Sequence, residues 1–148
     1  MSRTQHVLIV EDNDDDFETA VEAARRAGVI NRLDRAVSGS ACLEMLGASA
    51  QQPGPLPALV LLDLNMPSED GRDALRLIRN DERLACVPLV VLSASANPRD
   101  VQFAYTNGVN AYHIKPVNHA SHLGILQKIF DYWLVDILLP TQRSLKSS

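Results

Sequence analysis

The sequence predicts an α/β protein, a doubly wound (βα)5 domain in which five parallel strands alternate with helices. Three observations predict this fold class. Short apolar runs of strand length recur along the chain, stripes of apolar residues at helical spacing separate them, and glycine or proline stands at most boundaries. Strands that alternate with helices form a mostly parallel sheet covered on both faces. At 148 residues, 46% of them hydrophobic, the chain suits one domain with a buried core.

Five runs of residues are expected to form the strands, and in chain order they lie at 6–10, 33–37, 58–64, 87–93 and 110–114. The first run stops abruptly at Glu11 and Asp12. The runs at 58–64 and 87–93 are apolar almost throughout, which indicates strands that are buried on both faces of the sheet. The run at 33–37 is short, and we expect it near an edge of the sheet.

The first helix is expected directly after the acids that end the first strand. Its apolar residues recur at i, i+3, i+4 and i+7, and they are Phe17, Ala20, Val21 and Ala24. We expect Asp14 to be the N-cap, with Asp15 and Asp16 in the first turn, where carboxylates favour the positive end of the helix dipole. Gly28 is expected to end this helix.

Four more helices are expected after the remaining strands. A short helix is predicted at 41–46, and the next one begins at the Asp-Gly pair of 70–71. Asn97, which a proline follows, is typical of a helix N-cap, and Gly108 is expected to end that helix. A long last helix is expected from Asn118 onward.

Charge and composition argue against several classes of function. The net charge is −4 and no cluster of lysine or arginine stands out, which argues against binding to nucleic acid or to an anionic membrane surface. No apolar run is long enough for a signal peptide or a bilayer span, so we expect a soluble cytoplasmic protein. Cys42 and Cys86 are interpreted as small buried hydrophobes rather than as a disulfide or a metal site.

Chemically active side chains collect where the strands end. In an open parallel sheet, functional sites lie outside the carboxyl ends of the strands. Glu11 and Asp12 follow the first strand, Asp63 and Ser93 come late in the third and fourth, and Lys115 follows the fifth. Each residue alone has an ordinary structural explanation, such as a helix start or a surface lysine. Their coincidence at four strand ends favours a functional site.

The three carboxylates predict a site for Mg²⁺. Three buried anions are costly unless a cation balances them, and hard oxygen ligands of this kind suit Mg²⁺. We expect Asp12 and Asp63 to ligate the metal directly and Glu11 to ligate it through water. The backbone carbonyl of Asn65 is expected to complete the ligands that the protein supplies.

The chemistry that these groups suggest is phosphoryl transfer onto a carboxylate. Such transfer depends on positioning and on charge neutralisation. Asp63 is the expected nucleophile and would become an aspartyl-phosphate. Lys115 would pair with one phosphate oxygen as a point charge, and the Ser93 hydroxyl would donate a hydrogen bond to another.

Four segments at these strand ends resemble the receiver domain of two-component response regulators. They are VED at 10–12, LLDLNMPSEDG at 61–71, VVLSAS at 90–95 and NAYHIKPV at 110–117. The resemblance covers residues 5–130. It implies a flavodoxin-like sheet of strand order 2-1-3-4-5 and a Mg²⁺-dependent transfer of a phosphoryl group from a sensor histidine kinase to Asp63. The chain would then be a phosphoacceptor signalling protein rather than an enzyme.

The resemblance also implies a conformational switch. Ser93 stands where the family has serine or threonine, and Tyr112 stands where it has its switch aromatic, although an ordinary edge-strand aromatic is the alternative. On phosphorylation Ser93 would move toward the phosphate and Tyr112 would turn inward. The surface of the fourth helix, fifth strand and fifth helix would change as a result. The family also implies a cis peptide bond between Lys115 and Pro116.

The C-terminal segment IFDYWLVDILLP, at 129–140, resembles the tail of stand-alone regulators that partner phytochrome-type sensor kinases. Its apolar residues fall at i, i+3, i+4, i+7 and i+8, and they are Phe130, Trp133, Leu134, Ile137 and Leu138. Part of this stripe is expected to pack the last helix against the core. We expect the remainder, with Trp133 as its anchor, to form a symmetric homodimer through the fourth and fifth helices, with residues 131–148 as a dimerisation extension and tail. Pro140 is expected to end the helix.

Two other functions remain open from the sequence. A Mg²⁺-dependent phosphatase of the haloacid dehalogenase kind would also use an aspartyl nucleophile, but it needs an acid where this chain has Asn65. A phosphorylation-independent scaffold would keep the fold and use only the apolar stripe around Trp133.

Overall fold

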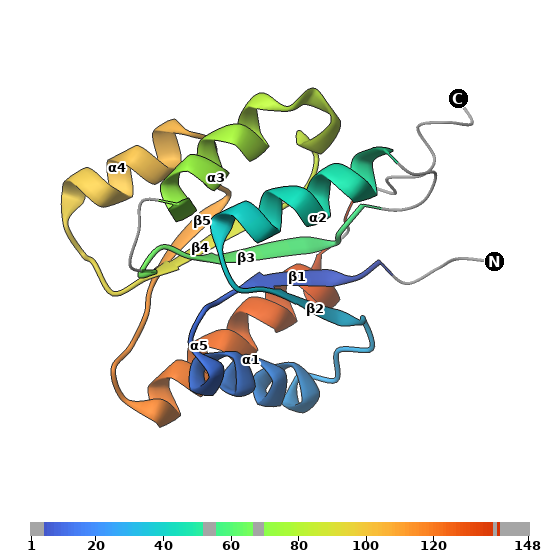
Figure 1. Ribbon diagram of the computed structural model, residues 1–148. Coiled ribbons are helices and arrows are strands. Elements are labelled where there is room, and N and C mark those ends of the chain that lie inside the picture. Colours follow the sequence, from blue (N-terminus) through green and yellow to red (C-terminus); the bar gives the residue numbers. More distant parts are fainter. Residues whose placement is uncertain (1–4, 52–55, 67–69, 138, 140–148) are drawn as a thin grey trace.

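The computed structural model describes residues 5–51, 56–66, 70–137 and 139, which form a parallel sheet with helices on both faces (Figure 1). The elements in chain order are β1 (Val7–Val10), α1 (Asp14–Arg26), β2 (Leu33–Ala36), α2 (Gly39–Gln51), β3 (Leu59–Asp63), α3 (Asp70–Asn80), the 3-10 helix η1 (Glu82–Leu84), β4 (Leu89–Ser93), α4 (Pro98–Thr106), β5 (Ala111–Ile114), α5 (His119–Asp131) and the π-helix η2 (Tyr132–Asp136). The strand order is β2-β1-β3-β4-β5, and every neighbouring pair is parallel. The predicted fold class and strand order are confirmed.

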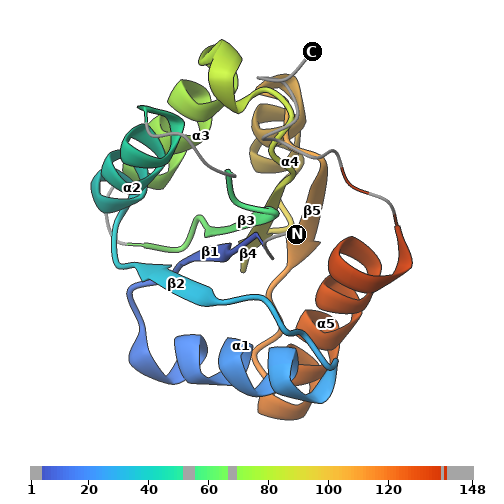
Figure 2. The ribbon, with the colours of Figure 1, turned by 90° about the vertical axis from the view of Figure 1, so that its right-hand side faces the viewer.

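Two layers of helices cover the sheet. The helices α1 and α5 pack side by side on one face, and α2, α3 and α4 lie on the other (Figures 1 and 2). The buried apolar residues therefore separate into two cores, one on each side of the sheet.

The central strands supply side chains to both cores. In β3, Val60 and Leu62 lie in the core beneath α2 and α3, while Leu59 and Leu61 lie in the core beneath α1 and α5. All residues of β3 and of β4 are buried. Burial on both faces explains why these two segments are apolar almost throughout instead of alternating with polar residues. The edge strand β2 has one buried residue, Ala36.

Most helix ends lie where the capping residues predict them. Asn97 and Asn118 cap α4 and α5, and their side chains accept hydrogen bonds from backbone N–H groups of the first turn. Gly28 and Gly108 follow α1 and α4 with φ of +78° and +90°, a left-handed conformation that glycine adopts without strain. The helix α2 is longer than the short segment that the sequence suggests.

The N-cap of α1 is Asn13, so the expectation that Asp14 caps this helix is wrong. Asn13 has extended backbone dihedrals, and its Oδ1 accepts a hydrogen bond of 2.9 Å from the N–H of Asp16. Asp14 is the first residue of the helix, and its carboxylate pairs with Arg35 at 2.8 Å. Asparagine and aspartate are similarly good N-caps, so the run Asn-Asp-Asp-Asp does not fix the residue at which the helix begins.

The C-terminal apolar stripe does not keep the spacing that the sequence suggests. The helix α5 ends at Asp131 and continues as η2, a wider turn whose hydrogen bonds run between residues i and i+5. Phe130 is 0% exposed and lies in the core beneath α1 and α5, so its assignment to a dimer interface is wrong. Trp133 and Leu134 pack partly against the same core. Leu138 and Pro140 lie outside the described residues.

Two other apolar side chains of η2 face solvent. Tyr132 is 52% exposed and Val135 is 59% exposed. The ring of Tyr132 meets the ring of Trp133 edge-on, with 5.1 Å between centroids. Ile137, just after η2, is half-buried. Among the described residues at this end of the chain, the exposed apolar surface is therefore centred on η2 rather than on the predicted stripe.

The two cysteines differ in their surroundings. Cys42 is buried, as expected, whereas Cys86 is exposed, and its assignment as a buried hydrophobe is wrong. Leu84 and Val87 supply the core contacts of this segment, which leaves Cys86 facing outward between them. None of the described helices is both long and apolar enough to cross a membrane.

Replacing Asn13 by alanine should lower the free energy of unfolding by about 1 kcal/mol, because α1 loses the side chain that accepts from the Asp16 N–H. Asp14→Ala should cost less, since its pair with Arg35 is exposed to solvent on the Asp14 side. Urea denaturation followed by circular dichroism measures both changes. A larger loss in Asp14→Ala than in Asn13→Ala would contradict this assignment of the cap.

Candidate functional site

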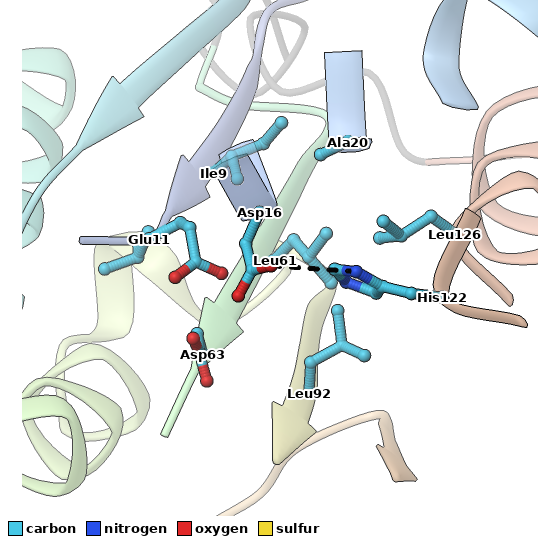
Figure 3. Close-up of a pocket in the computed structure, with 10 residues that line it drawn as sticks. Ile9, Glu11, Asp16, Ala20, Leu61, Asp63, Leu92, His122 and Leu126 are labelled. Carbon is cyan, nitrogen blue, oxygen red and sulfur yellow. Dashed lines mark ion pairs between the residues drawn. The ribbon is translucent and has the colours of Figure 1, made fainter. Parts of the chain in front are cut away.

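The carboxyl ends of β1, β3, β4 and β5 meet at one edge of the sheet and bring the predicted site residues together. Glu11 follows β1, Asp63 and Ser93 are the last residues of β3 and β4, and Lys115 follows β5. Figure 3 shows the carboxylates of Glu11 and Asp63 at this edge. Glu11, Asp63 and Ser93 are buried, whereas Asp12 is exposed.

The ammonium group of Lys115 lies between three carboxylates. Its Nζ is 3.0 Å from Glu11 Oε1, 2.9 Å from Asp63 Oδ2 and 2.7 Å from Asp16 Oδ2. The lysine side chain is largely buried, with 12% of its surface exposed. The ammonium group donates hydrogen bonds to Glu11 and Asp63 and forms an ion pair with Asp16.

Burial and neighbouring charges change the proton affinity of this cluster. Burial, and then the charge of Asp63, raise the pKa of Glu11 from 4.5 to about 7, while Lys115 opposes the rise. Burial acts to lower the pKa of Lys115, but hydrogen bonds to Asp16 and Asp63 raise it above its ordinary value. Lys115 therefore stays a cation at neutral pH, whereas the raised pKa of Glu11 lies close to neutral pH.

The same edge offers a set of ligands for a divalent cation. Carboxylate oxygens of Glu11, Asp12 and Asp63 lie within 4.8 Å of one another. All are hard oxygen donors of the kind that suits Mg²⁺, and the exposed Asp12 leaves the set open to solvent. The N–H of Asn65 donates to Asp63 Oδ1 at 2.8 Å, which orients that carboxylate. The residues present therefore fit such an ion.

Ser93 and Tyr112 are connected through the loop between β4 and α4. Ser93 Oγ accepts a hydrogen bond of 3.1 Å from the N–H of Ser95. The hydroxyl of Tyr112 donates to the backbone carbonyl of Ser95 at 2.8 Å. Ser95 is absent from the predicted site because both of these contacts use its backbone, which carries no signature in the sequence.

Two further residues at this edge are not predicted from the sequence. Asp16 is expected only as a first-turn acid, yet it contacts Lys115, and the buried His122 of α5 faces its other carboxylate oxygen at 3.9 Å (Figure 3). Asp16 is the third residue after the cap Asn13, and side chains of a helix tilt toward its N-terminus, which here points at the sheet edge. That position is the signal that could have identified it. A single histidine in the last helix gives no such signal.

The peptide bond between Lys115 and Pro116 is trans, and the structure has no cis peptide bond among its described residues. The expectation of a cis bond at this position is therefore wrong. The trans bond already places Lys115 Nζ within reach of both Glu11 and Asp63. Trans is also the favoured isomer of bonds before proline, by about 0.5–1 kcal/mol.

Comparison with known proteins identifies the class to which this fold and site belong. The response regulator receiver domain family matches residues 7–127. The chain therefore belongs to this family, and it is a receiver domain of the kind that two-component response regulators carry.

Individual relatives extend the similarity over most of the chain. The probable methanogenesis regulatory protein FilR2 of Methanothrix harundinacea is 37% identical over 128 residues, which make up 86% of this chain and 83% of that protein. The crystal structure of the phosphorylated cyanobacterial phytochrome response regulator RcpA has a TM-score of 0.85 at 32% identity and covers 94% of this chain and 100% of its own. The Mn²⁺-bound form of response regulator Rcp1 has a TM-score of 0.83 at 33% identity, covering 93% and 99%.

The stability of the metal-free protein should depend on the protonation of Glu11. Its pKa is about 7 in the folded protein and 4.5 ordinarily, so between these values the folded state holds a proton that the unfolded chain releases. Stability should therefore fall as the pH rises through this window, by roughly 1–3 kcal/mol relative to a variant that cannot titrate there. Glu11→Gln is that variant. Urea denaturation in EDTA from pH 4.5 to 8 gives the difference, and a difference that stays flat or rises with pH would contradict the prediction.

Proposed function

We propose that this chain accepts a phosphoryl group on Asp63 from a sensor histidine kinase. The observation that carries the proposal is the position of Asp63, which lies 2.9 Å from Lys115 Nζ and within 4.8 Å of carboxylate oxygens of Glu11 and Asp12. Phosphoryl transfer needs an acceptor, ligands for a divalent cation and a fixed positive charge, and these four residues supply them. Membership of the receiver domain family supports the same function.

In the proposed reaction a carboxylate oxygen of Asp63 attacks the phosphorus of a phosphohistidine on the kinase. The new bond is O–P, the P–N bond breaks, and its electron pair stays with the imidazole nitrogen that leaves. Lys115, which already contacts Asp63, pairs with one oxygen of the transferred group. Ser93 donates its hydroxyl to a second oxygen, because its Oγ accepts the N–H of Ser95 and its own O–H proton remains available.

The proposed cofactor is Mg²⁺, held by Asp12 and Asp63, by Glu11 through water, and by the backbone carbonyl of Asn65. When bound, the ion neutralises negative charge on the oxygens of the transferred group. The carboxylate oxygens gathered at this edge support the assignment, as does the existence of a Mn²⁺-bound form of the similar regulator Rcp1.

The proposed partner is a phytochrome-type sensor kinase. RcpA is described as a phytochrome response regulator, and its likeness covers 94% of this chain. The family match stops at residue 127, whereas this likeness reaches beyond it. The segment after α5 is therefore part of what the two proteins share.

We expect phosphorylation to be read out at the surface that α4, β5 and α5 form. Tyr112 of β5 packs partly against the core and is tied to Ser95 by its hydroxyl. A shift of Ser93 toward the phosphate changes the loop to which Tyr112 is bound. The side chain then exchanges this position for the space that Ser93 vacates.

The dimer contact that we propose lies on η2 and β5. A groove of about 400 Å³ is lined by residues of β5, α5 and η2, including His113, Lys128 and Trp133. Tyr132 also lines it, and the exposed Val135 lies on the same turn. Apolar side chains exposed together in this way are typical of a contact surface, and a second copy of the chain is the proposed occupant.

Asp63→Asn should abolish phosphorylation by a small-molecule donor such as acetyl phosphate, because the amide cannot act as the nucleophile. Asp73→Asn makes the same substitution at an exposed aspartate of α3 and should be phosphorylated like the wild type. Addition of EDTA should stop the reaction in the wild type and in Asp73→Asn. Intact-protein mass spectrometry measures the gain of one phosphoryl group. Phosphorylation of Asp63→Asn at the wild-type level would refute the assignment of the acceptor.

Val135→Glu should weaken the proposed dimer, because it places a charge in the apolar contact on η2. Val37→Glu is the matched control, since Val37 is similarly exposed but follows the edge strand β2. Sedimentation velocity, with and without beryllofluoride as a phosphoryl mimic, gives the oligomeric state. A wild-type protein that remains monomeric under both conditions would rule the dimer out.

A further inference from the structure

Asp16 differs from the other two carboxylates that contact Lys115. Glu11 and Asp63 belong to the group of carboxylates that fits a divalent cation, together with Asp12, whereas Asp16 does not. Yet its contact with Lys115, at 2.7 Å, is the shortest of the three. Asp16 is therefore placed to hold the lysine without holding the metal.

The carboxylate of Asp16 is partly buried, and each of its two oxygens faces a side chain. Its Oδ2 forms an ion pair with the ammonium group of Lys115, and its Oδ1 lies 3.9 Å from Nδ1 of the buried His122 (Figure 3). The side chain is 31% exposed, compared with 85% for Asp14 in the same turn. The backbone N–H of Asp16 is fixed by the side chain of Asn13. An acid that only favoured the helix dipole would need none of these contacts.

The geometry points to Asp16 as a positioning residue that keeps Lys115 aimed at Asp63, an inference that rests on the function proposed above. In this structure the lysine donates hydrogen bonds to Glu11 and Asp63 and forms its shortest ion pair with Asp16. Once Glu11 and Asp63 also interact with a divalent cation, Asp16 is the carboxylate in this cluster that interacts with Lys115 and not with the metal. It then holds the ammonium beside the phosphate oxygen that Lys115 has to meet.

Without this contact, Lys115 would keep its positive charge but its side chain would be less well oriented. The side chain of Lys115 has a flexible four-carbon stem and a strongly hydrated head. Without Asp16, rotamers that carry the head toward solvent become accessible, and the productive one must be selected at each transfer. The effect of Asp16 on phosphorylation should therefore pass through Lys115 and vanish when the lysine is absent.

Asp16→Asn should slow phosphorylation of Asp63 by acetyl phosphate by about tenfold at saturating Mg²⁺, because the ammonium of Lys115 loses its shortest ion pair. Asp15→Asn is the matched control, because Asp15 is an exposed acid of the same helical turn. Its side chain lies beside Glu18 and Glu22, on a different side of α1 from Lys115. This substitution removes the same charge from the same helix end and should leave the rate unchanged. Asp16→Glu, which keeps the charge, should recover part of the rate.

A double-mutant cycle separates positioning from general destabilisation. In a Lys115→Gln background, Asp16→Asn should have no further effect on the phosphorylation rate. The two substitutions should also be non-additive in the urea midpoint of the metal-free protein, which is measured in EDTA and needs no activity. Additive effects in either measurement, or an Asp16→Asn rate equal to that of Asp15→Asn, would overturn the inference. A wild-type protein that takes up no phosphate would instead overturn the function on which it rests.

Discussion

One lysine holds together the sheet edge on which the site depends. Lys115 contacts carboxylates from three separate elements, namely Glu11 after β1, Asp16 in α1 and Asp63 at the end of β3. Carboxylates buried without a cation would oppose folding strongly. The balance is still incomplete, because three acids face one ammonium, and burial together with Asp63 leaves Glu11 with a raised pKa. The edge therefore favours further positive charge, and the exposed Asp12 provides the open side at which a cation can enter.

The hydrophobic pattern of the strands confines this charge to one place. The strands β1, β3 and β4 are buried along their whole length, so ionised groups are tolerated only where these strands end. Parallel pairing then brings the ends together, as the register of Asp63 with Leu92 and of Ser93 with Ile114 shows. The helices that cover both faces leave the edge as the place where polar groups and solvent meet. The same residues that build the two cores therefore also determine where the chemistry lies.

The parts of the fold and site that were predictable have a strong signal in the sequence. A strand buried on both faces is a long apolar run with an abrupt polar end, and Asp63 stands at such an end. The start of α1 was not predictable to the residue, because Asn13 and Asp14 are both good caps. That shift of one residue decides which first-turn acid can reach the lysine, and it turns Asp16 toward the site. Phe130 belongs to the buried stripe of α5 with Leu126 and Ile129, whereas the π-helical turn that begins at Tyr132 changes the phase of the apolar residues after it, a result of packing that helical periodicity cannot encode.

The loop after β4 connects the site to the outer surface through one residue. Ser95 donates its N–H to Ser93, accepts the hydroxyl of Tyr112 on its carbonyl, and contacts Asp100 of α4 with its own hydroxyl. Asp100 in turn pairs with Arg72 of α3. In the proposed switch, a shift of Ser93 toward a phosphate would act on Ser95 through their hydrogen bond, and a shift of Ser95 would change its contacts to β5 and α4. These contacts supply the route by which the proposed rotation of Ser93 would reach α4 and β5.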